Sequence, residues 1–182
     1  MNDTKWVILD RDGVINHDSD HYIKSPEEWQ PIIGSPEAVA LLNEQGFKVV
    51  VITNQSGIAR GLYDLDTLER IHAKMHASVA AAGGEITEIF YCPHGPEDNC
   101  ACRKPRTGLF EQFASKYDID LNGIPMVGDA IRDIQAAQSV GCLPLLVMTG
   151  KGELTLERYP DFEFPYFANL HEAAKYIVRH YS

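Results

Sequence analysis

Short apolar runs alternate along the chain with longer segments in which apolar residues recur every three or four positions. The runs have the length and β-branched content of buried strands, and they cover residues 7–9, 47–52, 86–91, 124–127 and 143–148. The periodic segments predict helices over about 35–46, 64–83, 107–117, 131–140 and 170–180. Because strand and helix alternate, we expect an α/β fold with a doubly wound, mainly parallel sheet.

Local signals place the ends of some helices. Ser35 is expected to be the N-cap of the first helix, and Asp64 or Asp66 that of the second. On the second helix, His72 and His76 are four residues apart, a spacing that suits zinc, but no third ligand is near and we expect both to face solvent. The segment 16–31 has little periodicity and is predicted to be a loop over the site.

The length of 182 residues predicts one domain spanning residues 1–182. No segment approaches the roughly 18 consecutive apolar residues of a membrane span, and the first residues lead directly into a strand, so we expect no signal peptide and a cytoplasmic location. The net charge of −10 makes nucleic acid an unfavourable partner. We expect a monomer that acts on a small molecule.

Polar side chains stand where three predicted strands end. Asp10 and Asp12 follow the first strand, Thr53 the second and Asp129 the fourth, while Lys104 precedes the fourth. Because parallel strands end on one edge of a sheet, we expect these groups to meet there. Carboxylate oxygens bind Mg²⁺, and a hydroxyl and an ammonium bind phosphate oxygens. The set therefore predicts a magnesium-assisted phosphoryl site.

The same residues resemble the motifs of the haloacid dehalogenase superfamily of aspartate-based phosphatases. The matching segments are Asp10-Arg11-Asp12-Gly13-Val14, then Thr53, Lys104 and Gly128-Asp129-x3-Asp133, in the family's order. The resemblance implies that Asp10 attacks phosphorus and that Asp12 protonates the leaving oxygen and later activates water. It also implies that Thr53 and Lys104 hold the phosphoryl group. Mg²⁺ would be bound by Asp10, the backbone carbonyl of Asp12, and Asp129, with Asp133 behind them.

Three cysteines and a histidine lie within eleven residues, at Cys92, His94, Cys100 and Cys102. They form a complete tetrahedral set with no open position, which favours structural over catalytic zinc. The cluster directly precedes Lys104, so we expect the metal to fix the loop that presents this lysine.

The cysteine loop, together with segments 52–61 and 102–105, is similar to the histidinol-phosphatase-like branch of the superfamily. This resemblance implies a sugar phosphate substrate, a heptose 1,7-bisphosphate of the lipopolysaccharide core pathway that loses its 7-phosphate, with histidinol phosphate as the alternative. The expected substrate contacts are Asp18, His21, Asn54, Gln55, Ser56, Arg60 and Arg103. One departure is Ala130, because some members carry a basic residue directly after the metal aspartate.

Two further functions share parts of this pattern. A phospho-aspartate signalling receiver also uses acids, a threonine and a lysine, but here Lys104 precedes the last acid, and Asp12 supplies a general acid that a slow switch does not need. A polynucleotide end-phosphatase is disfavoured by the negative charge. The gaps between the motifs hold too few residues for a cap domain, so specificity should fall to loops 16–31 and 55–63 and to the cysteine loop.

Overall fold

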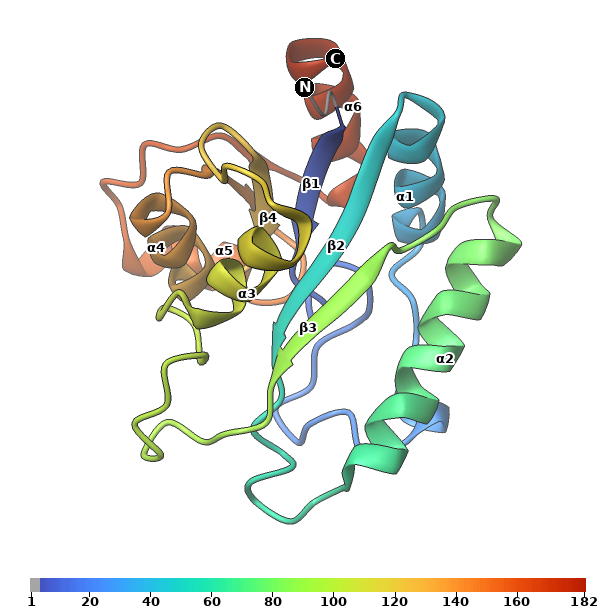
Figure 1. Ribbon diagram of the computed structural model, residues 1–182, viewed down its shortest axis with the longest axis vertical. Coiled ribbons are helices and arrows are strands. Elements are labelled where there is room, and N and C mark those ends of the chain that lie inside the picture. Colours follow the sequence, from blue (N-terminus) through green and yellow to red (C-terminus); the bar gives the residue numbers. More distant parts are fainter. Residues whose placement is uncertain (1–3) are drawn as a thin grey trace.

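A computed structural model of the chain describes residues 4–182 as a six-stranded sheet with helices on both faces (Figure 1). The strands lie in the order β3-β2-β1-β4-β5-β6, and each pairs in parallel with its neighbours. Their bounds are β1 Lys5–Leu9, β2 Phe47–Asn54, β3 Glu88–Cys92, β4 Pro125–Gly128, β5 Leu143–Val147 and β6 Tyr166–Phe167. The predicted doubly wound α/β fold is therefore confirmed.

Helices cover the two faces of this sheet. They are α1 Ser35–Glu44, α2 Leu65–Ala81, α3 Gly108–Tyr117, α4 Ile131–Ser139, α5 Gly152–Arg158 and α6 Leu170–Tyr181, with a 3-10 turn at Pro26–Glu28. Helices α1, α2 and α6 pack on one face, and α3 and α4 pack on the other (Figure 1). None of the helices in residues 4–182 combines the length and the hydropathy that a membrane span requires.

The central strand β1 explains why its sequence reads as an unbroken apolar run. Val7 and Leu9 belong to the core beneath α1, α2 and α6, whereas Ile8 belongs to the core beneath α3 and α4. All three side chains are completely buried. A strand covered on both faces has no solvent side on which to alternate polar residues.

The structure corrects several predicted boundaries. Strand β2 continues through Thr53 and Asn54, which pair with β3 rather than following the strand as a loop. The N-cap of α1 is Gly34, because the Ser35 hydroxyl instead donates to the carbonyl of Val14 at 2.8 Å. Asp64 is confirmed as the N-cap of α2, since its side chain accepts from the Thr67 amide.

Two elements near the carboxyl terminus were not predicted, helix α5 and strand β6. Both are short, and β6 pairs only through Tyr166 and Phe167 with the end of β5. Neither has enough residues to display a period, so their formation depends on packing against the finished sheet.

Candidate active site

The carboxyl ends of β1 and β4 bring together a buried cluster of acids around one lysine. The Nζ atom of Lys104 lies 3.1 Å from Oδ1 of Asp10 and 2.8 Å from Oδ1 of Asp133, and it donates to the carbonyl of Ile52 at 2.7 Å. Lys104 is only 1% exposed and Asp10 only 4%. A buried ammonium is tolerable here because its donors meet anions and a carbonyl. The structure therefore joins motifs that lie up to 123 residues apart in the sequence, Asp10 and Asp133.

Asp133, in the first turn of α4, holds the end of β4 in place. Its Oδ2 atom accepts from the backbone amides of Asp129 and Ala130, each at 3.2 Å. A side chain at Gly128 would meet this carboxylate, because an added Cβ would lie 2.3 Å from the Cβ of Asp133. Asp133 thus orients Asp129 and balances Lys104, which agrees with the supporting position that the resemblance implies.

The acids at this edge fit a divalent cation. Carboxylate oxygens of Asp10, Asp129 and Asp133 all lie within 4.8 Å of one another. Oδ1 of Asp129 is buried without a hydrogen-bond partner in the described part of the chain. Burial, then the charge of Asp133, raises the pKa of Asp10 to about 7, and burial with the charge of Asp10 raises the pKa of Asp129 well above its ordinary value. A hard cation such as Mg²⁺ would relieve this repulsion.

Two glycines leave the space in which the Asp129 carboxylate lies. An added Cβ at Gly13 would stand 2.1 Å from Oδ2 of Asp129, and one at Gly150 would stand 2.3 Å from the same atom. Gly13 also has a φ of +82°, in the left-handed region that other residues rarely adopt. Oδ2 of Asp129 accepts from the backbone amide of Lys151 at 2.9 Å. Close backbone approach therefore fixes one oxygen of this acid and leaves the other free to bind.

Asp12 lies beside this cluster in a different environment. Its Oδ1 accepts from Nε and Nη2 of Arg11 at 3.1 and 2.8 Å and from Nδ2 of Asn16 at 2.9 Å, and its Oδ2 accepts from Nε2 of Gln55 at 3.0 Å. Burial alone would raise the pKa of Asp12, but the Arg11 charge and these hydrogen bonds lower it below its ordinary value. The pKa values of these two acids, which are separated by one residue, are thus shifted in opposite directions, upward for Asp10 and downward for Asp12.

Thr53 completes the set that the strand ends were predicted to supply. Its hydroxyl is fully buried and accepts from Nε2 of Gln55 at 2.9 Å. Gln55 is held in turn by Tyr63, whose hydroxyl donates to Oε1 at 2.6 Å. The structure therefore places Thr53 and Asp12 on either side of one glutamine amide.

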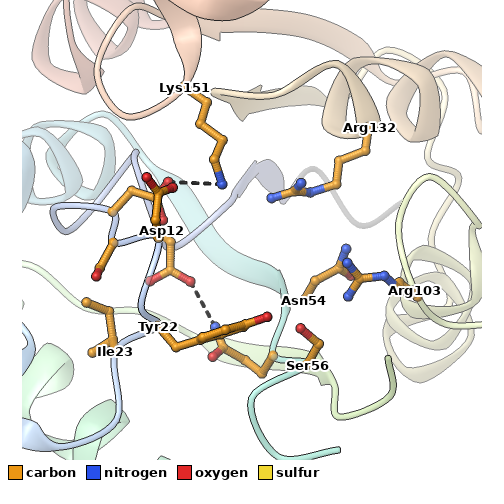
Figure 2. A pocket seen from close by; sticks show the side chains of 12 residues that line it. Asp12, Tyr22, Ile23, Asn54, Ser56, Arg103, Arg132 and Lys151 are labelled. Atoms are coloured by element: carbon orange, nitrogen blue, oxygen red, sulfur yellow. Dashed lines mark hydrogen bonds and ion pairs between the residues drawn. The ribbon is translucent and has the colours of Figure 1, made fainter. Parts of the chain in front are cut away.

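A pocket of about 190 Å³ opens above Asp12. Figure 2 shows its lining, with Tyr22 and Ile23 on one side and Arg132 and Lys151 extending from the other. Of the residues expected to contact substrate, five line this pocket: Asp18, Asn54, Gln55, Ser56 and Arg103. The other two lie outside its lining. His21 is exposed, and the Arg60 guanidinium lies 5.8 Å from the ring centre of Tyr22.

Sequence reasoning missed two cations of the pocket, Arg132 and Lys151. Lys151 forms an ion pair with Asp18, with 3.2 Å between Nζ and Oδ2. Within residues 4–182, Arg132 has no acidic oxygen within ion-pair distance, and its Nε is buried without a hydrogen-bond partner. The signal that points to Arg132 is its place in the first turn of α4, a helix that begins at the sheet edge where the acids end. Arg132 therefore supplies a positive charge to the pocket, although position 130, where some family members carry a basic residue, is an alanine here.

The cysteine loop brings its four predicted ligands together. Sγ of Cys92 lies 2.8 Å from Sγ of Cys102, 3.6 Å from Sγ of Cys100 and 3.6 Å from Nδ1 of His94. Nδ1 of His94 lies 3.3 Å from Sγ of Cys102. Tetrahedral zinc with Zn–S bonds of about 2.3 Å separates its ligands by roughly 3.5–3.8 Å. The two 3.6 Å spacings agree with this range, whereas Sγ of Cys102 lies closer than that to Cys92 and His94 and would move outward around an ion. Three thiols and one imidazole gathered within 4.8 Å of one another are a ligand set suited to zinc.

His72 corrects the expectation that both histidines of α2 face solvent. Its side chain is only 7% exposed, and its Nε2 lies 3.2 Å from Nη1 of Arg11. His76, one turn further along, is exposed. The pattern of the helix alone did not reveal this contact, because the partner comes from the loop after β1.

The chain is similar in sequence to proteins of a known family. Residues 101–173 match the family model described as HAD-hydrolase-like. A curated D-glycero-beta-D-manno-heptose-1,7-bisphosphate 7-phosphatase from Bordetella bronchiseptica is 55% identical over 152 residues, covering 84% of this chain and 85% of the relative. The protein of that name from Neisseria meningitidis serogroup A is 46% identical over 179 residues, covering 96% and 95%.

A solved structure is similar over nearly the whole chain. It is the crystal structure of D,D-heptose 1,7-bisphosphate phosphatase from B. bronchiseptica complexed with magnesium and phosphate. The TM-score is 0.93 at 49% sequence identity, covering 96% of this chain and 98% of the other.

Proposed function

The chain belongs to the haloacid dehalogenase-like family of these phosphatases, and on that premise we propose that it removes the 7-phosphate of D-glycero-D-manno-heptose 1,7-bisphosphate with the help of Mg²⁺. The chain is therefore a phosphatase, and the proposal concerns its substrate, its metals and its mechanism. The observation that carries it is the buried Asp10 between Lys104 and Asp129, beneath a pocket lined by three cations.

Asp10 has the position of the nucleophile. One of its oxygens would form a bond to phosphorus while the bond from phosphorus to the sugar oxygen breaks, which leaves a phospho-aspartate. Lys104 and Thr53 would hold the phosphoryl oxygens through an ammonium and a hydroxyl. Asp10, the backbone carbonyl of Asp12, and Asp129 would hold Mg²⁺, whose positive charge reduces the repulsion between the nucleophile and the phosphate.

Asp12 has the position of the acid and base. Its carboxyl would give a proton to the sugar oxygen as that oxygen leaves, and its carboxylate would then take a proton from the water that attacks phosphorus. That second attack releases inorganic phosphate and restores Asp10. The hydrogen bonds to Arg11, Asn16 and Gln55 favour the carboxylate form, which is the form the second step requires.

The pocket supports an anionic substrate with a second phosphate. Arg103, Arg132 and Lys151 place three positive charges around a space of about 190 Å³, and within residues 4–182 only Lys151 of the three forms an ion pair. Histidinol phosphate carries an ammonium group instead of a second phosphate, so the same cations would repel it. This difference favours the heptose bisphosphate over the histidinol alternative.

The cysteine loop is proposed to hold structural zinc. All four positions of a tetrahedron are supplied by Cys92, His94, Cys100 and Cys102, which leaves no place for a reacting water. The proposal also retains a cytoplasmic monomer without nucleic-acid or membrane partners, and the charge of −10 supports it with respect to nucleic acid.

A phosphate-release assay tests the substrate. The panel is heptose 1,7-bisphosphate in both anomers, histidinol phosphate and a 3′-phosphorylated oligonucleotide, each with and without added Mg²⁺. We expect the bisphosphate to give the highest kcat/KM, only with Mg²⁺, and phosphorus NMR to show that the remaining phosphate is on C1. Preferred hydrolysis of histidinol phosphate or of the oligonucleotide would overturn the substrate assignment. Undiminished turnover without any divalent cation would overturn the metal assignment.

A further inference from the structure

Arg11 is a buried cation that enters the proposed mechanism only through its hydrogen bonds to Asp12. It lies between the two acids in the sequence, its side chain is completely buried, and it is absent from the lining of the pocket. Its Nε and Nη2 both donate to Oδ1 of Asp12, at 3.1 and 2.8 Å. A buried guanidinium of this kind touches no substrate, so its contribution must pass through the group it contacts.

The third guanidinium nitrogen of Arg11, Nη1, contacts His72. Nη1 of Arg11 lies 3.2 Å from Nε2 of His72, and because arginine can only donate, this nitrogen must carry a free lone pair. His72 is therefore neutral and protonated on Nδ1. Burial, then the positive charge of Arg11, lowers the pKa of His72 to about 3, in agreement with this geometry.

The neutral ring of His72 affects Arg11 differently from a carboxylate in the same position. A carboxylate beside Nη1 would compete with Asp12 for the charge of Arg11, whereas the imidazole satisfies the donor and leaves that charge directed at Asp12. His72 lies in the second turn of the 17-residue helix α2, which packs against the core beneath the sheet. The helix therefore supplies a rigid support for a side chain at the end of β1.

We propose that Arg11 and His72 are positioning residues for Asp12: His72 fixes the Arg11 guanidinium, and Arg11 fixes the carboxylate that must face the leaving oxygen. The inference rests on the proposed role of Asp12 as acid and base. Asp12 also has anchors at Asn16 and Gln55, so loss of the His72 contact weakens its placement without freeing it. We expect a loss of roughly tenfold, a fraction of the 10²–10⁴-fold that general acid catalysis supplies.

A matched pair of variants tests this role. His72→Gln keeps an acceptor oxygen at a similar reach, whereas His72→Met fills a similar volume without an acceptor suited to the guanidinium. His76→Ala, an exposed histidine on the same helix, is the control. Each protein is assayed for kcat/KM with the heptose bisphosphate and with p-nitrophenyl phosphate, whose leaving group departs as an anion without needing a proton. Thermal midpoints and hydrogen exchange establish that each variant is folded at the assay temperature.

The leaving group separates positioning from general damage. We expect His72→Met to lose roughly tenfold in kcat/KM on the sugar phosphate but less than about twofold on the aryl phosphate, while His72→Gln retains most of the wild-type value on both. Equal losses on both substrates, or equal losses for the Gln and Met variants, would show that His72 only supports the fold and would overturn the inference.

Asp12→Asn is the reference variant, because it tests the acid role of Asp12 separately from the positioning role of His72. If Asp12→Asn loses much more kcat/KM on the sugar phosphate than on the aryl phosphate, the acid role of Asp12 holds. If His72→Met then keeps the wild-type ratio of kcat/KM between the two substrates, only the positioning role of His72 is refuted. If Asp12→Asn loses equally on both substrates, the proposed mechanism itself fails, and the inference fails with it.

Discussion

Two ligand clusters lie at the same edge of the sheet, and they are built in opposite ways. The acids Asp10, Asp129 and Asp133 are at most 4% exposed, and they stand at the ends of β1 and β4 and in the first turn of α4. In the cysteine cluster, Cys92 is the buried last residue of β3, and the other three ligands lie on the loop between β3 and α3, where His94 is exposed. Strand ends and the first turn of a helix fix the first cluster, whereas in the second only Cys92 belongs to a strand and the other three ligands come from the loop that follows it.

This difference separates two uses of a metal. In the acid cluster the geometry exists already, and a cation is needed to balance the charge of carboxylates that repel one another. In the cysteine loop His94 is exposed and Cys100 and Cys102 are half-buried, so a bound cation would hold together a segment that has no regular secondary structure of its own. We therefore expect magnesium to govern activity without changing the fold, and zinc to govern local order.

Lys104 connects the two clusters. Its ammonium lies among the acids, and its backbone is tied to β2 because its amide donates to Oδ1 of Asn54 at 3.0 Å while Nδ2 of Asn54 donates to its carbonyl at 3.1 Å. Within residues 4–182, Arg103, one residue earlier, forms no such pair of hydrogen bonds with a strand, and its Nη1 is buried without a hydrogen-bond partner. Disorder of the cysteine loop should then displace Arg103 more than Lys104.

The largest effect should come from the nucleophile. Asp10→Asn replaces an anion with an amide that cannot attack phosphorus or supply negative charge to the metal, so we expect turnover to fall by at least ~10⁴-fold. Zinc content, measured by metal analysis, should remain at about one per chain. A loss of zinc in this variant would show that the two clusters are not independent, and wild-type turnover would refute the role of Asp10.

Loss of a zinc ligand should have a smaller and different effect. Cys100→Ser should lower the zinc content and increase amide hydrogen exchange over residues 92–104, because metal binding orders this loop. We expect kcat/KM to fall roughly 10–100-fold, with more of the change in KM, since Arg103 lines the pocket and Lys104 is held by Asn54.

Cys142→Ala is the matched control for this variant, because it removes a buried thiol outside the loop. It should keep zinc and the exchange pattern of the loop. Trapping the phospho-aspartate as a beryllofluoride adduct distinguishes a catalytic zinc. A zinc-free protein that keeps an ordered loop and forms the intermediate at the normal rate, but fails to hydrolyse it, would refute structural zinc.

Thermal unfolding measures how far Mg²⁺ stabilises the acid cluster. Ligand at a hundredfold excess over its Kd stabilises a protein by about 2.7 kcal/mol, which for a chain of this size is a rise in Tm of roughly 5–10 °C. Asp129→Asn removes one of the repelling charges, so it should melt above the wild type without Mg²⁺ and respond little when Mg²⁺ is added. A lower Tm in the metal-free variant would contradict the view that these acids repel one another in the folded protein.

The sequence predicted the features that arise from local pattern. Apolar runs located the first five strands, and the acids after β1 and β4 located the edge where chemistry is expected, because strand ends in a parallel sheet share one edge. The spacing of Cys92, His94, Cys100 and Cys102 likewise needs no knowledge of the fold, since all four lie within eleven residues of sequence.

Features that depend on contacts between distant segments were missed. Lys151 reaches the pocket from the turn after β5, and His72 meets Arg11 across 61 residues of sequence. A helix pattern gives the face on which His72 lies, but not the cation that approaches that face. The N-cap of α1 was misplaced for a related reason, because the Ser35 hydroxyl found a tertiary partner in Val14.

The smallest effect concerns acid stability and again involves His72. Its pKa in the folded protein is lowered from 6.5 to about 3, by burial and then by the charge of Arg11, while Asp12 acts in the opposite direction and His76 adds to the lowering. Between these two pH values, His72 is protonated in the unfolded chain and neutral in the folded chain. Stability contributed by the neutral ring is therefore present above about pH 6.5 and is lost as the pH falls toward about 3.

His72→Gln removes this titration while keeping an acceptor for Arg11. At about 1.36 kcal/mol per pH unit, the wild type should lose up to about 2 kcal/mol more unfolding free energy than the variant between pH 7 and pH 5. Urea unfolding at both pH values, with zinc and Mg²⁺ held constant, measures the difference. His76→Gln, which changes an exposed ring on the same helix, should keep the wild-type dependence. If His72→Gln loses as much stability as the wild type, the ring of His72 takes up a proton in the folded protein at no extra cost. Because protonation of Nε2 removes the acceptor for Arg11, that result would contradict a fixed contact between His72 and Arg11.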